Sequence, residues 1–206
     1  MEFPIDFDIF ENQIACVYGF GDSLGERYFQ RVYVGQIGRE LKVIDQNIRA
    51  LQVRWMDSEN LLVLGIKNGG TSLYKISFIE NEKRFVETVS NTNNFKIEEL
   101  IIGNSNFYIN DFAYNDSKIY MTISMNNNSD IYYYDLNTKE ILCLLSTPNK
   151  ENSLFIKDDI LYFTSDKNAK FDIYSYNFQN SQIKQITNTS ISIQNPIILD
   201  EQIYFR

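Results

Sequence analysis

The chain has 206 residues, a net charge of −8 and no histidine. This acidic balance argues against a nucleic-acid-binding protein, because phosphate recognition needs clustered lysine and arginine, and those residues are scattered here. The hydrophobic fraction of 44% and the aromatic fraction of 15% are ample for a packed core and exclude a disordered chain.

A short apolar strand ending near a tyrosine recurs along the chain. The four tyrosines are Tyr33, Tyr74, Tyr132 and Tyr174, spaced by about 41, 58 and 42 residues. Another apolar strand begins about 13 residues before each of the last three, at Leu61, Ile119 and Leu161. A fixed period of about 40 to 45 residues with several short strands per unit is typical of a β-propeller. We therefore predict an all-β fold, with residues 1–206 forming a single β-propeller segment.

The repeats divide the chain into four complete units and part of a fifth. They are predicted at about 4–46, 49–90, 108–147, 152–188 and, for the partial unit, 193–206. Each complete unit is expected to form a four-stranded blade, apolar on both faces because neighbouring blades cover it. Since the fifth unit stops after its second strand and a propeller must close its ring, we expect the chain to belong to a larger ring.

The second unit is irregular. Its outer strand is predicted near residues 85–89, and an insertion follows at about 91–106. This insertion contains the sequence KIEELII at 96–102, which is compatible with a short helix or an additional strand. A loop carrying one turn of helix is the favoured interpretation.

Two stretches resemble a known type of repeat. The segment ILYFTSDKNAKFDIYSYNFQNSQIKQITN at 160–188 resembles TolB-type propeller repeats, with Ile186 and Thr187 at the closing Leu-Thr-like pair. The segment at 54–77 is similar to repeats of the acylaminoacyl-peptidase branch of the prolyl oligopeptidase family, with Met-Asp-Ser-Glu replacing the usual Ser-Pro-Asp-Gly-like turn. This resemblance implies a propeller that covers a separate α/β-hydrolase domain and filters its peptide substrates.

The sequence Gly21–Gly25 matches the G-x-S-x-G pattern of a hydrolase nucleophile elbow, with Ser23 as the nucleophile. That chemistry needs a helix after the serine and a histidine to accept its proton. The following residues indicate a strand instead, and the chain has no histidine. We interpret the motif as a glycine-rich turn and predict no catalytic residue in this chain.

No metal or cofactor site is predicted. Oxygen ligands occur in the loops 126–130 and 165–168, but neither has the spacing of an EF-hand, and hairpin turns are the favoured interpretation. A carboxylate pair for glycoside hydrolysis could be drawn from 27 acidic residues in many ways, with nothing to choose among them.

Asp130 and Asp172 each precede an anchor tyrosine by two residues, and Arg31 and Ser72 hold this place in the first two units. The aspartates could be ligands, but we favour a structural role in which they accept backbone N–H bonds of the hairpin and fix its register. Trp55 is expected in the core, with a position bordering the central channel as the alternative.

The N-terminus has no basic region followed by an apolar stretch, so no signal peptide is predicted. No run of apolar residues is long enough for a membrane span, and no membrane partner is expected. Cys16 and Cys143 are expected to be buried and reduced, which favours a cytoplasmic protein.

Two functions remain open. The first is a non-catalytic propeller portion of a prolyl-oligopeptidase-family serine peptidase, partnered by a hydrolase domain or a second propeller half. The alternative is a stand-alone TolB-like propeller that binds a protein or peptide and is completed by self-association.

Overall fold

The computed structural model describes residues 2–21, 28–45, 48–67, 69–79, 95–199 and 202–205. The regular elements in these ranges are β-strands, and within them no helix has the length and apolar character to cross a membrane. The chain divides into two compact units, residues 1–105 and 106–206, and each is described by itself.

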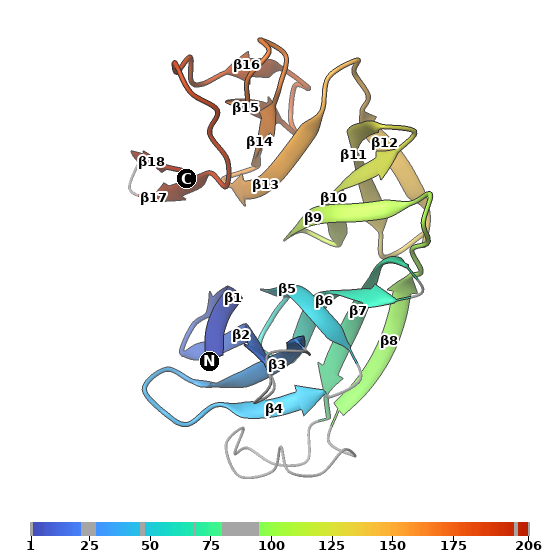
Figure 1. Ribbon diagram of the computed structural model, residues 1–206, viewed down its shortest axis with the longest axis vertical. Helices are drawn as coiled ribbons and strands as arrows, with labels where there is room; N and C mark the ends of the chain where they lie inside the picture. The colour runs from blue at the N-terminus through green and yellow to red at the C-terminus, as the bar shows by residue number, and fades with distance from the viewer. Residues whose placement is uncertain are drawn as a thin grey trace. The chain divides into compact units, whose positions relative to one another are not determined.

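The first unit contains two four-stranded antiparallel sheets, blade 1 (β1-β2-β3-β4) and blade 2 (β5-β6-β7-β8) (Figure 1). In each blade every strand pairs with the next along the chain. The bounds are β1 Glu2–Phe10, β2 Gln13–Gly21, β3 Tyr28–Gln36, β4 Lys42–Asp45, β5 Arg49–Trp55, β6 Asn60–Lys67, β7 Gly70–Phe78 and β8 Phe95–Ile101.

The second unit repeats this arrangement in blade 3 (β9 to β12) and blade 4 (β13 to β16), and adds a two-stranded sheet of β17 and β18 (Figure 1). The bounds are β9 Tyr108–Asn115, β10 Lys118–Met125, β11 Asn128–Asp135, β12 Ile141–Leu145, β13 Glu151–Lys157, β14 Ile160–Ser165, β15 Asp172–Asn177, β16 Ile183–Gln185, β17 Ile197–Leu199 and β18 Gln202–Tyr204. Four four-stranded blades and a partial fifth were expected from the sequence, and all are present, although the outer strand of blade 2 is not where it was predicted.

The preferred interpretation of residues 96–102 was wrong. These residues are not a loop with a turn of helix, because residues 95–101 form β8, the outer strand of blade 2, with Ile97 opposite Ile76 and Ile101 opposite Leu73. A fourth strand here pairs the free edge of β7, and Ile101 is buried. The outer strand predicted near 85–89 lies outside the described residues.

Two-residue turns connect the inner strands of blades 3 and 4. Both residues of each turn have positive φ, the geometry of a type I′ turn, which matches the twist of the paired strands. Aspartate, asparagine and serine accept this conformation more readily than most residues. The pairs are Asp116 and Ser117, Asn126 and Asn127, and Asp158 and Asp159.

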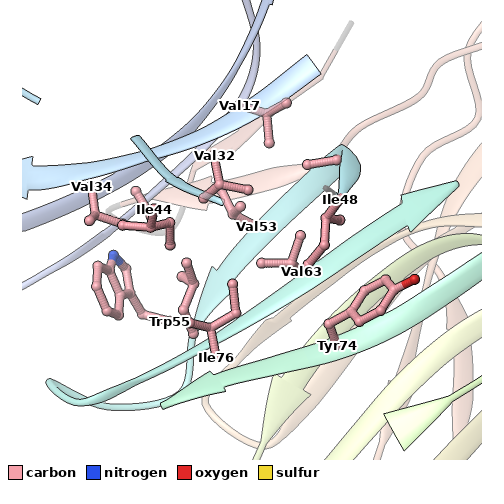
Figure 2. Close-up of a cluster of buried hydrophobic side chains, with 13 residues drawn as sticks. Val17, Val32, Val34, Ile44, Ile48, Val53, Trp55, Val63, Tyr74 and Ile76 are labelled. Carbon is pink, nitrogen blue, oxygen red and sulfur yellow. The ribbon is translucent and has the colours of Figure 1, made fainter. Parts of the chain in front are cut away.

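The core of the first unit lies between its two blades. Apolar side chains of β2, β3 and β4 pack against those of β5, β6 and β7 (Figure 2). Trp55 is 5% exposed and belongs to this cluster, which confirms its predicted place in the core. The second strand of each blade is apolar on both faces, and β6 has five consecutive buried residues. Both faces of β6 are therefore buried.

In the second unit an equivalent cluster joins blades 3 and 4. Ala113, Tyr120 and Ile131 of blade 3 contact Leu154 and Phe163 of blade 4 within one buried cluster. The ring of Tyr120 stacks on that of Phe178, with 4.7 Å between the ring centroids. This aromatic pair packs the outer hairpin of blade 4 against blade 3.

A carboxylate on the first strand of one blade receives a backbone N–H from the first strand of the next. In the first unit, Val53 N donates to Asp6 Oδ2 at 2.8 Å, and Trp55 N donates to Asp8 Oδ2 at 2.7 Å. In the second unit, Leu154 N donates to Asp111 Oδ2 at 2.7 Å. These bonds satisfy N–H groups that have no strand on that side.

The first strand of blade 1 is less covered than its counterpart in blade 2. Phe7 pairs with Cys16 as Val53 pairs with Val63, so the two residues hold equivalent places. Val53 is fully buried against blade 1, whereas Phe7 is 60% exposed. Ile9, two residues further along β1 on the same face, is also exposed, as is Ile5 at the register irregularity between Pro4 and Asp6. This face of β1 is therefore apolar and uncovered.

Candidate functional site: a pocket around a buried glutamate

The nucleophile-elbow motif is not accompanied by the expected helix. Ser23 itself lies outside the described residues, while residues 28–36 form strand β3. The sequence after the motif is therefore a strand, as predicted, and not the helix that a nucleophile elbow requires.

Asp172 binds the segment that leaves the outer strand of blade 4. Its side chain is fully buried, and Oδ1 accepts hydrogen bonds from Thr189 N at 3.0 Å and from the Thr187 hydroxyl at 3.1 Å. The Lys170 ammonium pairs with Oδ2. Burial by itself would raise the pKa of Asp172, but the bonds from Lys170, Thr189 and Thr187 hold that pKa below its ordinary value.

The equivalent residue in blade 3 makes the same contact. Thr147 N donates to Asp130 Oδ1 at 3.0 Å, and Thr147 lies 17 residues after Asp130, as Thr189 does after Asp172. In blade 2, Gly103 N donates to the Ser72 hydroxyl at 3.2 Å. The aspartates therefore accept backbone N–H bonds as expected, but from the segment after the fourth strand rather than from the hairpin. We call this segment the exit segment of a blade.

The loops considered as metal sites are turns. Asn126 and Asn127 form the turn between β10 and β11, and Asp166 accepts Lys150 N at 2.8 Å. Within the described part of the chain, no group of three or more acidic or cysteine side chains could hold a metal ion. Cys16 is buried as expected, but Cys143 is exposed, because it lies on the outer strand β12.

A pocket of about 230 Å³ lies in the second unit, where the exit segment of blade 3 passes beside blade 4. Apolar side chains provide most of its walls: Leu145, Pro148, Phe163, Tyr174 and Ile183. The polar residues of the lining are Thr147, Asn149, Glu151, Ser165 and Lys167.

Glu151 is the chemically unusual residue of this pocket. It is 1% exposed, and its Oε1 accepts the Thr147 hydroxyl at 2.8 Å and the Ser165 hydroxyl at 3.2 Å. Its other oxygen, Oε2, is buried and has no hydrogen-bond partner among the described residues. Burial raises the pKa of Glu151 from 4.5 to about 7, and the hydroxyl bonds oppose this shift without cancelling it. The carboxyl group therefore titrates near neutral pH.

The sequence analysis missed Glu151, although the repeat contains a signal for it. Glu151 pairs with Ser165 as Ala50 pairs with Gly65 and Ile109 with Ile123, so the three residues hold one position in three blades. Ala50 and Ile109 are fully buried. Once the strand registers are known, an acidic residue at a position that is apolar in two other blades indicates a buried carboxyl group.

Comparison with known proteins addresses the fold. No family model and no curated protein matches this chain. TolB from Acinetobacter baumannii matches with a TM-score of 0.61 and 13% identity over 93% of this chain. A structure from a study of two prolyl endopeptidases matches with a TM-score of 0.67 and 12% identity over 99% of it. A puromycin hydrolase matches with a TM-score of 0.70 and 9% identity over 94% of this chain. The fold is that of a β-propeller.

At identities of 9 to 13%, these likenesses show the propeller fold. The chain spans 59% of the TolB structure, 31% of the prolyl endopeptidase and 32% of the puromycin hydrolase. It therefore corresponds to a part of each of these proteins.

We expect Asp172→Ala to destabilise the second unit more than Asp130→Ala. The first change removes a fully buried carboxylate and leaves the Thr189 N–H and the Thr187 hydroxyl without their acceptor, which lowers the free energy of unfolding by about 1.5 to 3 kcal/mol for each hydrogen bond to the charged group. The second removes a half-buried acceptor, a loss of about 1 to 2 kcal/mol. Urea unfolding followed by circular dichroism measures both, with Glu140→Ala as the exposed control. Equal small decreases in the free energy of unfolding for the two variants would show that the buried Asp172 carboxylate does not stabilise the exit segment of blade 4.

We expect Glu151→Gln to stabilise the protein above pH 7. The folded-state pKa lies above the unfolded value, so wild-type stability falls as the pH rises from about 4.5 to about 7 and then stays low. The full effect is on the order of 3 kcal/mol. Because glutamine cannot ionise, the stability of the variant does not decrease in this way as the pH rises. The chain has no histidine, and Asp8, whose pKa is also raised by burial, is present in both proteins, so the difference in pH slope between wild type and variant reports Glu151.

The measurement is urea unfolding at intervals from pH 5 to pH 8, with Glu140→Gln as a control that removes an exposed carboxylate. A variant with the wild-type pH slope, or with lower stability at pH 8, would contradict the raised pKa of Glu151.

Proposed function

We propose that this chain is the non-catalytic propeller portion of a prolyl-oligopeptidase-family serine peptidase, similar to acylaminoacyl-peptidases, and that it restricts substrate access to a hydrolase site. The observation that carries the proposal is the match to a prolyl endopeptidase, which covers 99% of this chain but 31% of that protein. The puromycin hydrolase match has the same proportions, with 94% and 32%. About two thirds of each of these two proteins therefore has no counterpart in this chain.

The composition of the chain supports a non-catalytic role. A Ser-His-Asp mechanism needs a histidine to take the serine proton, and residues 1–206 contain none. The nucleophile and its base would therefore belong to a separate α/β-hydrolase domain, the proposed partner. In that assembly the propeller would act by limiting which peptides reach the serine, so its effect would be on substrate size rather than on the chemical step.

A fluorophosphonate probe tests this proposal in the cells that make the protein. The probe modifies active serine hydrolases, and mass spectrometry then identifies the labelled polypeptides. We expect a labelled polypeptide to contain peptides of this chain, with the modified serine outside residues 1–206. We also expect the purified 206-residue chain to show no hydrolysis of acyl-peptide or prolyl model substrates.

The Ser23→Ala variant is the control for the purified chain. Turnover by the wild-type chain that Ser23→Ala retains would show catalysis independent of the elbow motif, and turnover that it abolishes would show a catalytic Ser23. Either result would contradict the non-catalytic assignment. Detection of this chain solely in unlabelled polypeptides would contradict the link to a peptidase.

A second function is favoured by the exposed face of β1. Ile5, Phe7 and Ile9 form an apolar row, while Val53, the counterpart of Phe7 in blade 2, is fully buried by the preceding blade. A further blade of the same polypeptide would cover this row in the peptidase proposal. A second copy of the chain would cover it in the alternative, a stand-alone TolB-like propeller that binds a protein or peptide and is completed by self-association.

Light scattering with Phe7→Ser distinguishes these two occupants. A discrete dimer of the purified chain that Phe7→Ser converts to monomers would favour self-association. We expect instead a monomer or a mixture of sizes, because the peptidase proposal covers this face with another blade. Ile102→Ser is the matched control, since Ile102 is also 60% exposed but does not lie on β1.

A further inference from the structure

The Glu151 pocket combines an incompletely bonded carboxylate with apolar walls. We propose that it binds a protonated amine carried on an apolar group about the size of one side chain. The inference rests on the second unit alone and is independent of the peptidase proposal. Glu151 replaces a residue that is apolar in blades 2 and 3, so burying it costs stability that an apolar residue would not cost. A ligand that pairs with the carboxylate accounts for that cost.

One oxygen of the Glu151 carboxylate is held in place and the other is unpaired. The Thr147 and Ser165 hydroxyls both donate to Oε1 and hold the group in place. Oε2 has no partner among the described residues and therefore needs a donor. An ammonium group supplies both a hydrogen bond and an opposite charge, and charge-assisted bonds are about twice as strong as neutral ones.

The charges around the pocket also favour a cation. Asp130 and Asp166 add negative potential at Glu151. The cation of the lining is Lys167, whose side chain is exposed to solvent. Phe163 and Tyr174 contribute aromatic rings to the wall, with centroids 5.9 Å apart. Aromatic rings stabilise a nearby ammonium through their negative faces.

The size of the pocket limits the ligand. Pockets for drug-sized molecules have volumes of about 300 to 1,000 Å³. The pocket here, at about 230 Å³, suits a single ring or an alkyl stem. Such an ammonium could come from a free amine or from a lysine side chain of a peptide. Leu145 and Ile183 would contact the apolar part in either case.

The test uses benzylamine for the free amine and Nα-acetyl-lysine amide for the peptide source, followed by NMR titration of the complete chain at pH 8. We expect saturable shifts of residues that line the pocket with at least one of them. Benzyl alcohol, which lacks the charge, should bind at least about tenfold more weakly than benzylamine, a difference of about 1.4 kcal/mol. Binding of one amine and not the other identifies the source.

Glu151→Gln should weaken amine binding by about tenfold or more, while Glu140→Gln should leave it unchanged. Ile183→Trp provides a second test, because it keeps the carboxylate but narrows the pocket from its exposed outer strand. It should weaken binding as well. Wild-type affinity in Glu151→Gln, equal binding of benzyl alcohol, or no shifts with either amine would overturn the proposal.

The pH dependence gives an independent readout. The amine pairs with the ionised carboxylate, so affinity should fall by up to about tenfold between pH 8 and pH 6, as Glu151, with a pKa of about 7, takes up a proton. The fall should vanish in Glu151→Gln. Asp130, Asp166 and Lys167 are the other charged groups near the carboxylate, and they are the same in the wild type and in Glu151→Gln. A wild-type affinity that is constant from pH 8 to pH 6 would overturn the assignment of Glu151.

Discussion

Each blade in this protein has two apolar faces and therefore depends on its neighbours. The five consecutive buried residues of β6 show the constraint, since a strand with water on one face would alternate apolar and polar residues. Burial of a large apolar side chain contributes about 1.5 to 3 kcal/mol, so packing between blades contributes substantially to the stability of the fold. The carboxylates of Asp6 and Asp111 extend across the same interfaces to backbone N–H groups.

The repeated polar contacts and the Glu151 pocket show two uses of a buried carboxylate. Asp172 has donors on both oxygens, from Thr189 N, the Thr187 hydroxyl and Lys170, and its pKa is held low. Glu151 has donors on one oxygen, and burial raises its pKa. The same type of side chain is thus fully hydrogen-bonded at one site and has an unpaired oxygen at the other.

Local sequence pattern was sufficient for most of the fold and insufficient for the site. Apolar runs separated by Asn, Asp and Ser located most of the strands, because these residues form the turns. The pattern did not identify β8 as a strand. Ile97, Leu100 and Ile101 are spaced as on one face of a helix, and the partner strand β7 is distant in the sequence. The unusual position of Glu151 is recognised by comparing the strand registers of different blades, and Cys143 is exposed because it lies on an outer strand. Neither can be read from neighbouring residues.

The exit segments show where a blade tolerates added length. The bond from the exit segment to the third strand spans 17 residues in blades 3 and 4 but 31 in blade 2, where Gly103 still reaches Ser72. The extra residues fall between β7 and β8, and the register of that strand pair is retained around them. The connection between the third and fourth strands is therefore a natural place to insert a fluorescent reporter or an affinity tag.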